Sequence, residues 1–316
     1  MSAKIPVGIS SCLLGEEVRF NGGHKRSRVC LNLFARVFEY RSFCPEVAIG
    51  LGVPRETIRL VGESAEHPRV VGTKTASLDV TEALYDYGQQ VASEIDDVSG
   101  YILMKNSPSC GLYSAKVYKK NSPLPGKHAG MFVRGLRSRQ PLLPMEEEGR
   151  LNDPLLRENF VAAVYAYHDW RCHFLPNASP KALVDFHTRY KLLLMSHGQK
   201  FYRELGQIVA EAGSAGFDER VDTYITLFMQ ALQKPSSRKG HVNTLFHILG
   251  YLRETLDGDV RQDIADLIER YRVGQINLSV PATMLNHYLK RHGGDYINEQ
   301  VYLKPYAEEL GLRNTI

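Results

Sequence analysis

The fold is decided near the N-terminus, where residues 4–15 read Lys-Ile-Pro-Val-Gly-Ile-Ser-Ser-Cys-Leu-Leu-Gly. The apolar first half of this stretch predicts a short buried strand, and Cys12 follows directly after it. Two further apolar segments are also predicted strands with a cysteine at or soon after their ends. Tyr40–Cys44 ends in a cysteine, and Tyr101–Met104 is followed by Cys110 after a short turn. In an open parallel sheet, ligands bind beyond the carboxyl ends of the strands. The sequence therefore predicts that three cysteines meet at one edge of a sheet.

Strand-like and helix-like segments alternate through the first part of the chain. We expect helices over Val29–Glu39 and Ser77–Val98, and further strands over Ile58–Val61 and Gly130–Val133. Alternation of this kind is typical of a mostly parallel sheet covered by helices. The sequence thus predicts an α/β, Rossmann-like N-terminal domain over residues 1–145.

The second part of the chain has a helical pattern. Residues 141–148 contain two prolines and an acidic run, and we interpret them as a linker. From about Asp153 onward, apolar residues recur three and four positions apart, as Phe160 and Val164 do. We therefore expect an all-α C-terminal domain over residues 150–316.

Length and composition limit the kinds of protein that this chain can be. It has 316 residues, more than a single hydrophobic core usually supports, and its 43% hydrophobic content is typical of soluble globular proteins. The sequence shows neither an apolar run of roughly 18 residues nor a signal peptide, so we expect a cytoplasmic protein. The formal charge of +4 permits an anionic partner such as RNA without demanding one.

The five cysteines are too few for a disulfide framework, and in a reducing cytosol they serve as core residues, metal ligands or catalysts. Cys12, Cys44 and Cys110 suit a soft metal centre with one open position, either a zinc ion or an iron–sulfur cluster. The alternative is that they are scattered core cysteines, since free cysteine is often buried. Cys30 fits that alternative, because it shares a predicted helix face with Leu33 and other apolar residues.

Polar residues near these cysteines complete the predicted site. Glu46 lies two residues after Cys44 and is the expected acid–base group, since a carboxylate beside a metal and apolar walls can exchange protons near neutral pH. Ser107 and Ser109 precede Cys110 on a turn that can hold a substrate, although serine is also common in turns for structural reasons. A basic loop near the first strand end either grips a phosphate or is simply solvated; its residues are Arg19, Lys25, Arg26 and Arg28.

Three motifs, in order, resemble the thiouracil desulfidase family. They are Ser-Ser-Cys-Leu-Leu-Gly at 10–15, Cys-Pro-Glu-Val-Ala-Ile-Gly-Leu-Gly-Val-Pro-Arg at 44–55 and Lys-Asn-Ser-Pro-Ser-Cys-Gly at 105–111. Farther along, segments 183–187 and 241–251 resemble the helical domain that is often fused to that desulfidase domain. The fused form resembles tRNA 4-thiouridine desulfidases.

The resemblance implies a 4Fe-4S cluster held by Cys12, Cys44 and Cys110, with one open iron that binds the thiocarbonyl sulfur of a thiolated pyrimidine. Glu46 would exchange protons, and the two serines before Cys110 would position the substrate. The implied reaction converts 4-thiouridine in tRNA to uridine and releases sulfide, a net hydrolysis in which an activated water replaces the sulfur. Two alternatives remain: a desulfidase for free thiobases such as 2-thiouracil, and a non-catalytic cluster-containing protein that binds or senses RNA.

We interpret the helical domain as a platform for tRNA. Affinity for RNA comes largely from phosphate contacts, and basic residues on helices are candidates, although a solvated helix face explains them as well. The candidates in this domain are His187, Lys191, Lys239 and His241. Thiolated tRNA is thus the expected partner, and neither a membrane nor an obligatory protein partner is expected.

Overall fold

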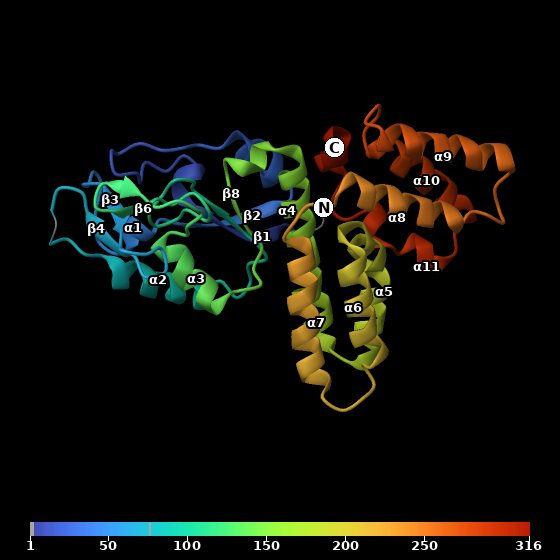
Figure 1. Cartoon of the computed structure of the whole chain (residues 1–316), viewed down its shortest axis with the longest axis horizontal. Coiled ribbons are helices and arrows are strands. Elements are labelled where there is room, and N and C mark those ends of the chain that lie inside the picture. The colour runs from blue at the N-terminus through green and yellow to red at the C-terminus, as the bar shows by residue number, and fades with distance from the viewer. Residues whose placement is uncertain (1–2, 76) are drawn as a thin grey trace. The chain divides into compact units, whose positions relative to one another are not determined.

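The structure is a computed structural model that describes residues 3–75 and 77–316 (Figure 1). The chain divides into two compact units, Met1–Asn152 and Asp153–Ile316. The first unit interleaves strands and helices, and the second consists of helices and short turns. The expected fold class, an α/β region followed by a helical one, is confirmed.

The centre of the first unit is a parallel sheet with the strand order β2-β1-β5-β8. In chain order its strands are β1 (Ile5–Ser10), β2 (Phe38–Phe43), β5 (Tyr101–Leu103) and β8 (Met145–Glu147). Val7, Ile9 and all of β5 are fully buried, which is typical of a parallel sheet covered on both faces. Gly8 leaves room for the ring of Tyr101, since a Cβ at this position would lie 2.3 Å from the ring's Cδ2.

A second, smaller sheet has the strand order β4-β3-β6-β7. Its strands are β3 (Ile58–Val61), β4 (Arg69–Gly72), β6 (Val117–Lys119) and β7 (Ser122–Pro123). β3 runs parallel to β6 and antiparallel to β4. Leu60, Val70 and Val117 from these strands pack with Leu84 and Met131 in one apolar cluster. The segment Ile58–Val61 is therefore a strand, as expected, but it belongs to a sheet that the sequence pattern does not predict.

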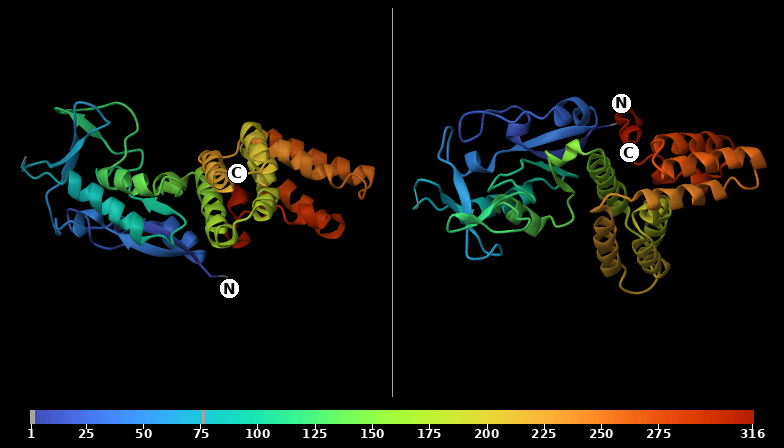
Figure 2. Two further views of the ribbon diagram at one scale, coloured as in Figure 1. Left: turned by 90° about the horizontal axis from the view of Figure 1, so that it is seen from below. Right: turned by 45° about the horizontal axis from the view of Figure 1, so that its top comes forward.

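Two helices, α2 (Thr81–Glu94) and α3 (Met131–Arg139), lie side by side in the first unit, as Figure 1 and Figure 2 show. Helix α3 packs on the main sheet through Phe132, whose ring centroid lies 6.1 Å from that of Tyr101. The two helices approach closely because α3 presents Gly135 at their contact, where no side chain separates the backbones. This helix pair forms one cover of the main sheet.

The segment expected as a fourth strand, Gly130–Val133, instead begins helix α3. Buried apolar residues continue past Val133 to Leu136 at helical spacing. A four-residue apolar run fits either a strand or a helix, and here the continued spacing favours the helix. The segment expected as a linker, 141–148, likewise contains β8, which pairs with β5 at the edge of the main sheet. The first expectation was wrong because the apolar run was considered over too few residues, and the second because pairing with β5 decides the structure.

In both segments of the first unit that were expected to be helices, the helical structure covers fewer residues than predicted. The segment expected as a helix over Val29–Glu39 contains two short helical pieces, a π-helix (Val29–Leu33) and a 3-10 helix (Phe34–Arg36). Strand β2 begins already at Phe38, because six of its residues pair with β1. The helix expected over 77–98 is confined to α2.

The second unit is built from helices. They are α4 (Pro154–Asp169), α5 (Pro180–His197), α6 (Gln199–Ala210), α7 (Phe217–Leu232), α8 (Arg238–Gly250), α9 (Gly258–Arg272), α10 (Ser279–His292) and α11 (Asp295–Asn298). Local sequence explains several of their starts: Asp153, Ser179 and Ser237 each accept backbone N–H hydrogen bonds from the first turns of α4, α5 and α8. A proline at the first position of α4 and of α5 favours the same boundary.

A cluster of aromatic side chains lies in the core of the helical unit. Trp170 stacks on Phe174 and Tyr224, with ring centroids 4.0 and 5.7 Å apart, and Phe186 meets Trp170 edge-on. Stacked and edge-on pairs stabilise a core beyond the burial of their apolar area. Across residues 3–75 and 77–316, no helix is both long and apolar enough to cross a lipid bilayer.

The close contact between α2 and α3 predicts that the substitution Gly135→Ala destabilises the protein. A Cβ at Gly135 would lie 2.0 Å from the carbonyl oxygen of Tyr85, so the helices must separate. We expect the free energy of unfolding in urea to fall by about 1–3 kcal/mol, as overpacked cores do. Gly250→Ala is the matched control, because a Cβ there meets nothing within 4 Å and alanine favours a helix by up to about 1 kcal/mol. Equal effects of the two substitutions would contradict the close approach.

Candidate functional site

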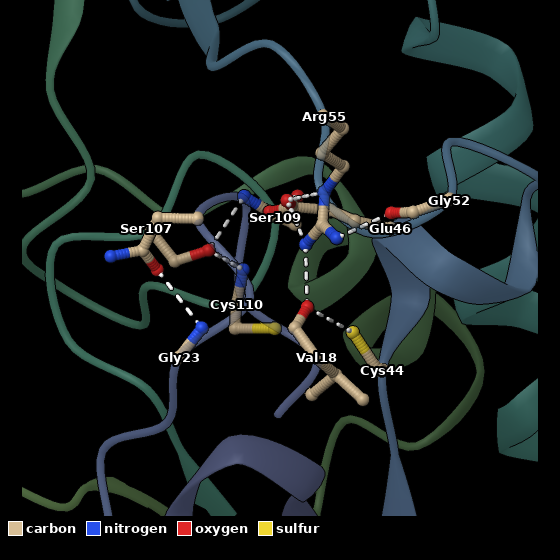
Figure 3. Close-up of polar contacts among 10 residues, drawn as sticks. Val18, Gly23, Cys44, Glu46, Gly52, Arg55, Ser107, Ser109 and Cys110 are labelled. Carbon is tan, nitrogen blue, oxygen red and sulfur yellow. Dashed lines mark hydrogen bonds and ion pairs between the residues drawn. The ribbon is translucent and has the colours of Figure 1, made fainter. Parts of the chain in front are cut away.

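Three neighbouring strands of the main sheet deliver cysteines to the same edge. β1 runs into a short turn, Ser11–Leu13, which carries Cys12. β2 ends one residue before Cys44, which precedes the short helix α1 (Pro45–Ala48), and the turn after β5 leads to Cys110. Because the strands are parallel and adjacent in the order β2-β1-β5, their carboxyl ends lie together. Figure 3 shows the thiols of Cys44 and Cys110 turned toward each other.

A cavity of about 220 Å³ lies at this edge, and all three cysteines line it. Polar groups from several loops share the lining: Ser10, Arg19, Glu46, Arg55, Asn106 and Ser107. Apolar walls come from residues such as Val18, Phe20, Phe43 and Met104. The cavity thus brings thiols, one carboxylate and guanidinium groups to a small and largely apolar space.

Burial raises the pKa of each of these three thiols. The pKa of Cys12 rises to about 11, chiefly through burial and then through the nearby charge of Cys44. Burial also raises the pKa of Cys44, and it raises that of Cys110 well above the usual value, with Glu46 contributing. A positive charge in this cavity, such as that of a metal ion, would favour the thiolate forms of these cysteines.

Cys30 lies outside this cavity lining and is fully buried in the α/β unit. Its carbonyl oxygen accepts a hydrogen bond from the Tyr40 hydroxyl at 2.7 Å, and burial raises the pKa of its thiol to about 11. This placement confirms the expectation that Cys30 is a core residue.

The turn that carries Cys110 is held by its own side chains and by α3. Ser107 Oγ accepts hydrogen bonds from the N–H groups of Ser109 at 3.2 Å and Cys110 at 3.0 Å, which is the structural role of a turn serine. Asn106 has a left-handed backbone with φ of 57°, a conformation that asparagine tolerates better than most residues. A Cβ at Gly130 would lie 2.4 Å from the Ser109 carbonyl oxygen, so the start of α3 packs directly on the turn.

Glu46 is held by partners at both carboxylate oxygens. Arg55 donates to Oε2 from Nε at 2.9 Å and from Nη2 at 2.7 Å, and Ser109 Oγ donates to Oε1 at 2.9 Å (Figure 3). The ion pair is largely buried, with side-chain exposures of 6% for Arg55 and 16% for Glu46. Ser109 is fully buried and does not line the cavity, so it acts on the site through Glu46.

Arg55 is a site residue to which sequence reasoning assigned no role. Besides Glu46, it donates from Nη1 to the Gly52 carbonyl oxygen at 2.8 Å and from Nη2 to that of Val18 at 2.9 Å. The Val18 oxygen in turn lies 3.8 Å from the Sγ atom of Cys44. Arg55 thus joins the loop after Cys12 to the segment that follows Cys44. Its position at the end of the second motif was the available signal, but spacing along a loop does not reveal a partner.

Glu147 is a second residue that sequence reasoning missed, because it lies in the segment interpreted as a linker. Its Oε1 atom accepts hydrogen bonds from the N–H groups of Leu112, Tyr113 and Ser114 at 2.8, 2.9 and 3.0 Å, and from Ser114 Oγ at 2.6 Å. Burial opposes ionisation of this carboxyl, but the hydrogen bonds from Ser114 and the backbone outweigh it and lower the pKa. A buried carboxylate therefore anchors the chain just after Cys110.

Of the basic residues expected near the first strand end, Arg19 lines the cavity. Its charge favours the thiolate of Cys12 and partly offsets the effect of burial on that pKa. Lys25, Arg26 and Arg28 are exposed and do not line the cavity. Their contact with a phosphate stays a prediction.

The two histidines expected to contact RNA are buried. His187 is 8% exposed, and its Nδ1 lies 3.1 Å from the Tyr224 hydroxyl; His241 is 3% exposed, and its Nδ1 lies 3.0 Å from the Tyr302 hydroxyl. Burial lowers the pKa of His187 to about 4 and that of His241 well below its usual value. Both rings are therefore neutral core groups, and the expectation of a phosphate contact was wrong for them.

The two lysines expected to contact RNA lie nearer the surface. Lys191 is half-buried, and its Nζ lies 4.6 Å from the ring centroid of Tyr296. Lys239 is exposed in the first turn of α8. For these two residues, contact with RNA stays a prediction.

Comparisons with known proteins divide the chain in a similar way. Residues 7–148 match the family described as 2-thiouracil desulfurase, and residues 191–307 match a family described as a protein of unknown function, DUF1722. A solved structure of the 4Fe-4S-dependent thiouracil desulfidase TudS is 29% identical, with 47% of this chain and 94% of that chain covered and a TM-score of 0.38.

Two curated relatives each match about half of this chain. YbgA of Escherichia coli (strain K12) is 31% identical over 156 residues, which are 49% of this chain and 90% of that protein. YbbK of Bacillus subtilis (strain 168) is 32% identical over 155 residues, 46% of this chain and 98% of that protein. Both relatives are named as uncharacterized proteins. Together with the match over residues 7–148, these relatives show that the chain belongs to the 2-thiouracil desulfurase family, with a DUF1722 region joined to the desulfurase domain.

Proposed function

We propose that this protein is a desulfidase that uses a 4Fe-4S cluster to remove sulfur from a thiolated uracil ring. The observation that carries the proposal is the single cavity lined by Cys12, Cys44, Cys110 and Glu46 within the desulfurase domain. Three thiols with one nearby carboxylate match the needs of a soft metal centre with an open position and an acid–base group.

The residues at the cavity fit such a cluster. Cys12, Cys44 and Cys110 would hold it, since their thiols line one space and gain stabilisation as thiolates from a positive centre. Within residues 3–75 and 77–316, no three histidine, cysteine, aspartate or glutamate side chains are gathered closely enough for a single metal ion. A polynuclear iron–sulfur centre can take one cysteine at each of three corners and leave the fourth iron open, which agrees with three cysteines delivered by three separate strand ends.

When bound, the cluster supplies an iron without a cysteine ligand, to which a thiocarbonyl sulfur has high affinity. The net reaction exchanges C=S for C=O: one water is consumed and hydrogen sulfide is released. Glu46 lines the cavity and is the group that takes a proton from the attacking water and returns it to the departing sulfur. Arg55 and Ser109 hold the Glu46 carboxylate in place. The apolar walls of the cavity exclude other water from the reacting ring.

Two substrates share this chemistry, and different observations support each. The family's description favours free 2-thiouracil. The helical unit, Asp153–Ile316, favours 4-thiouridine in tRNA, because a free base needs no second unit for its recognition. We propose thiolated tRNA as the substrate of the whole chain and regard free thiouracil as the second candidate.

Turnover by reconstituted protein tests the proposal directly. The protein would be loaded with iron and sulfide without oxygen, then given 4-thiouridine-containing tRNA or free 2-thiouracil in parallel. We expect loss of the thiobase absorbance together with sulfide release, and a higher kcat/KM for the tRNA. Faster turnover of the free base would make it the preferred substrate. A protein with an intact cluster that releases no sulfide from either would instead favour a non-catalytic, RNA-binding role.

The cysteine assignment predicts a contrast between two kinds of substitution. Cys12→Ala, Cys44→Ala and Cys110→Ala should each lower iron content after reconstitution, because each removes one of few ligands. Cys30→Ala should lower stability by about 1–3 kcal/mol but leave iron content unchanged, since Cys30 is a core residue. Iron analysis and the visible spectrum measure the first effect, and urea unfolding the second. Full iron content in any of the first three variants would remove that cysteine from the ligand set.

Glu46→Gln should keep the cluster and lower kcat by about 10²–10⁴-fold, the usual contribution of a general acid–base group. Arg55→Lys should lower kcat by about tenfold with little change in KM, since lysine keeps the charge but not the two-point contact with Glu46. Arg41→Lys is the matched control, because its ion pair with Asp97 is exposed. Wild-type kcat in Glu46→Gln would refute the acid–base role.

A further inference from the structure

A second cavity, of about 440 Å³, lies in the helical unit along one face of α10. The helix contributes side chains spaced three and four residues apart, among them Ser279, Thr283, Asn286 and Lys290. The C-terminal segment between residues 303 and 314 forms the rest of the lining. That segment is tied to the start of α10, since the Leu278 N–H donates to the Ile316 carbonyl oxygen at 2.7 Å.

The rim of this cavity is basic and rich in hydrogen-bond donors. Lys290 and Lys304 are exposed there, and the hydroxyl of Thr283 and the amides of Asn286 and Asn314 add neutral donors. Glu308 is the acidic residue of the lining, and it pairs with Lys304 at 3.2 Å. The pair is exposed and therefore weak, so Lys304 can exchange this partner for another anion at little cost.

Arg313 forms a buried ion pair with Glu158 at the wall of the cavity. It lines the cavity, is 9% exposed, and its guanidinium lies 4.8 Å from the ring centroid of Tyr302. Nε donates to Glu158 at 3.3 Å and Nη1 to the Tyr302 carbonyl oxygen at 2.6 Å, whereas Nη2 has no hydrogen-bond partner among the described residues. A buried donor without a partner is costly, and native structures rarely leave one. Glu158 balances the charge of Arg313, so the positive charge open to an anion in this cavity comes from Lys290 and Lys304.

We propose that this cavity binds a backbone phosphate of the RNA substrate. Phosphate oxygens accept from lysine, arginine, hydroxyl and amide donors alike, and such contacts position a nucleic acid without reading its sequence. The apolar part of the lining, which includes Leu303 and Tyr306, suits the adjoining sugar or base. The inference rests on the proposal that the substrate is a tRNA, and it assigns the helical unit a defined contact with that RNA.

Binding of unmodified tRNA to the full chain tests this site apart from catalysis. Fluorescence anisotropy would measure Kd at several salt concentrations for the wild type, Lys290→Gln and Lys304→Gln. Each variant should bind about three- to tenfold more weakly and show a salt dependence reduced by about one ion, as the loss of one phosphate contact predicts. Glu308→Gln should bind more tightly, since it removes the anion that competes for Lys304.

Lys181→Gln is the matched control, because Lys181 is an exposed lysine of the same unit that does not line the cavity. If Lys290→Gln and Lys304→Gln bind tRNA as Lys181→Gln does, the site is refuted. If uridine monophosphate binds at the cavity while tRNA affinity is unchanged in the variants, the cavity is a nucleotide site and the RNA assignment is wrong. Turnover of free 2-thiouracil, measured on the same variants, should be unaffected, which separates failure of this site from failure of the desulfidase proposal.

Discussion

The parallel pairing of β1 with both β2 and β5 is the constraint on which the candidate active site depends. The register places Ser10 opposite Phe43, so that β1 and β2 end together, and it places Gly8 opposite Tyr101 on the other side. Parallel strands point their carboxyl ends in one direction, and the loops that leave them must share one edge. Cysteines that are far apart in sequence are thereby brought to one cavity by backbone hydrogen bonds, without any attraction between the thiols themselves.

Two buried carboxylates then hold the loops that the strands bring close together. Glu147 is satisfied by backbone N–H groups and sets the path of the chain after Cys110, whereas Glu46 is balanced by Arg55 and faces the cavity. Removing one partner of a buried pair typically costs about 3–5 kcal/mol, against at most about 1 kcal/mol for an exposed pair such as Arg41 with Asp97. The two buried carboxylates therefore contribute more to the geometry of the site than the exposed ion pairs do.

The sequence predicts the fold class and the three strand ends because both depend on local apolar runs. The prediction was wrong over 130–133 because a four-residue segment is too short to show the helical spacing that continues to Leu136. It was wrong over 145–147 because that strand depends on its pairing with β5. The cavity lining contains all three of the cysteines chosen from sequence and also Glu46. The roles of Arg55 and Glu147 were not predictable, since each depends on partners that only the folded chain brings near. The prediction that His187 and His241 contact RNA was wrong for a related reason. Helical spacing alone does not tell whether a histidine lies on the exposed or the buried face of its helix.

The modest charge of the chain bears on how it could recognise RNA. A large net positive charge favours binding of a polyanion over a broad surface, and this chain carries a formal charge of only +4. We therefore expect phosphate contacts at a few places where exposed cations and hydrogen-bond donors converge. The cavity along α10 is such a place, because its lysines are exposed and its lining adds hydroxyl and amide donors. Discrete phosphate contacts also leave the choice of base to the desulfurase domain, whose cavity is lined by the groups that would contact the sulfur-bearing ring.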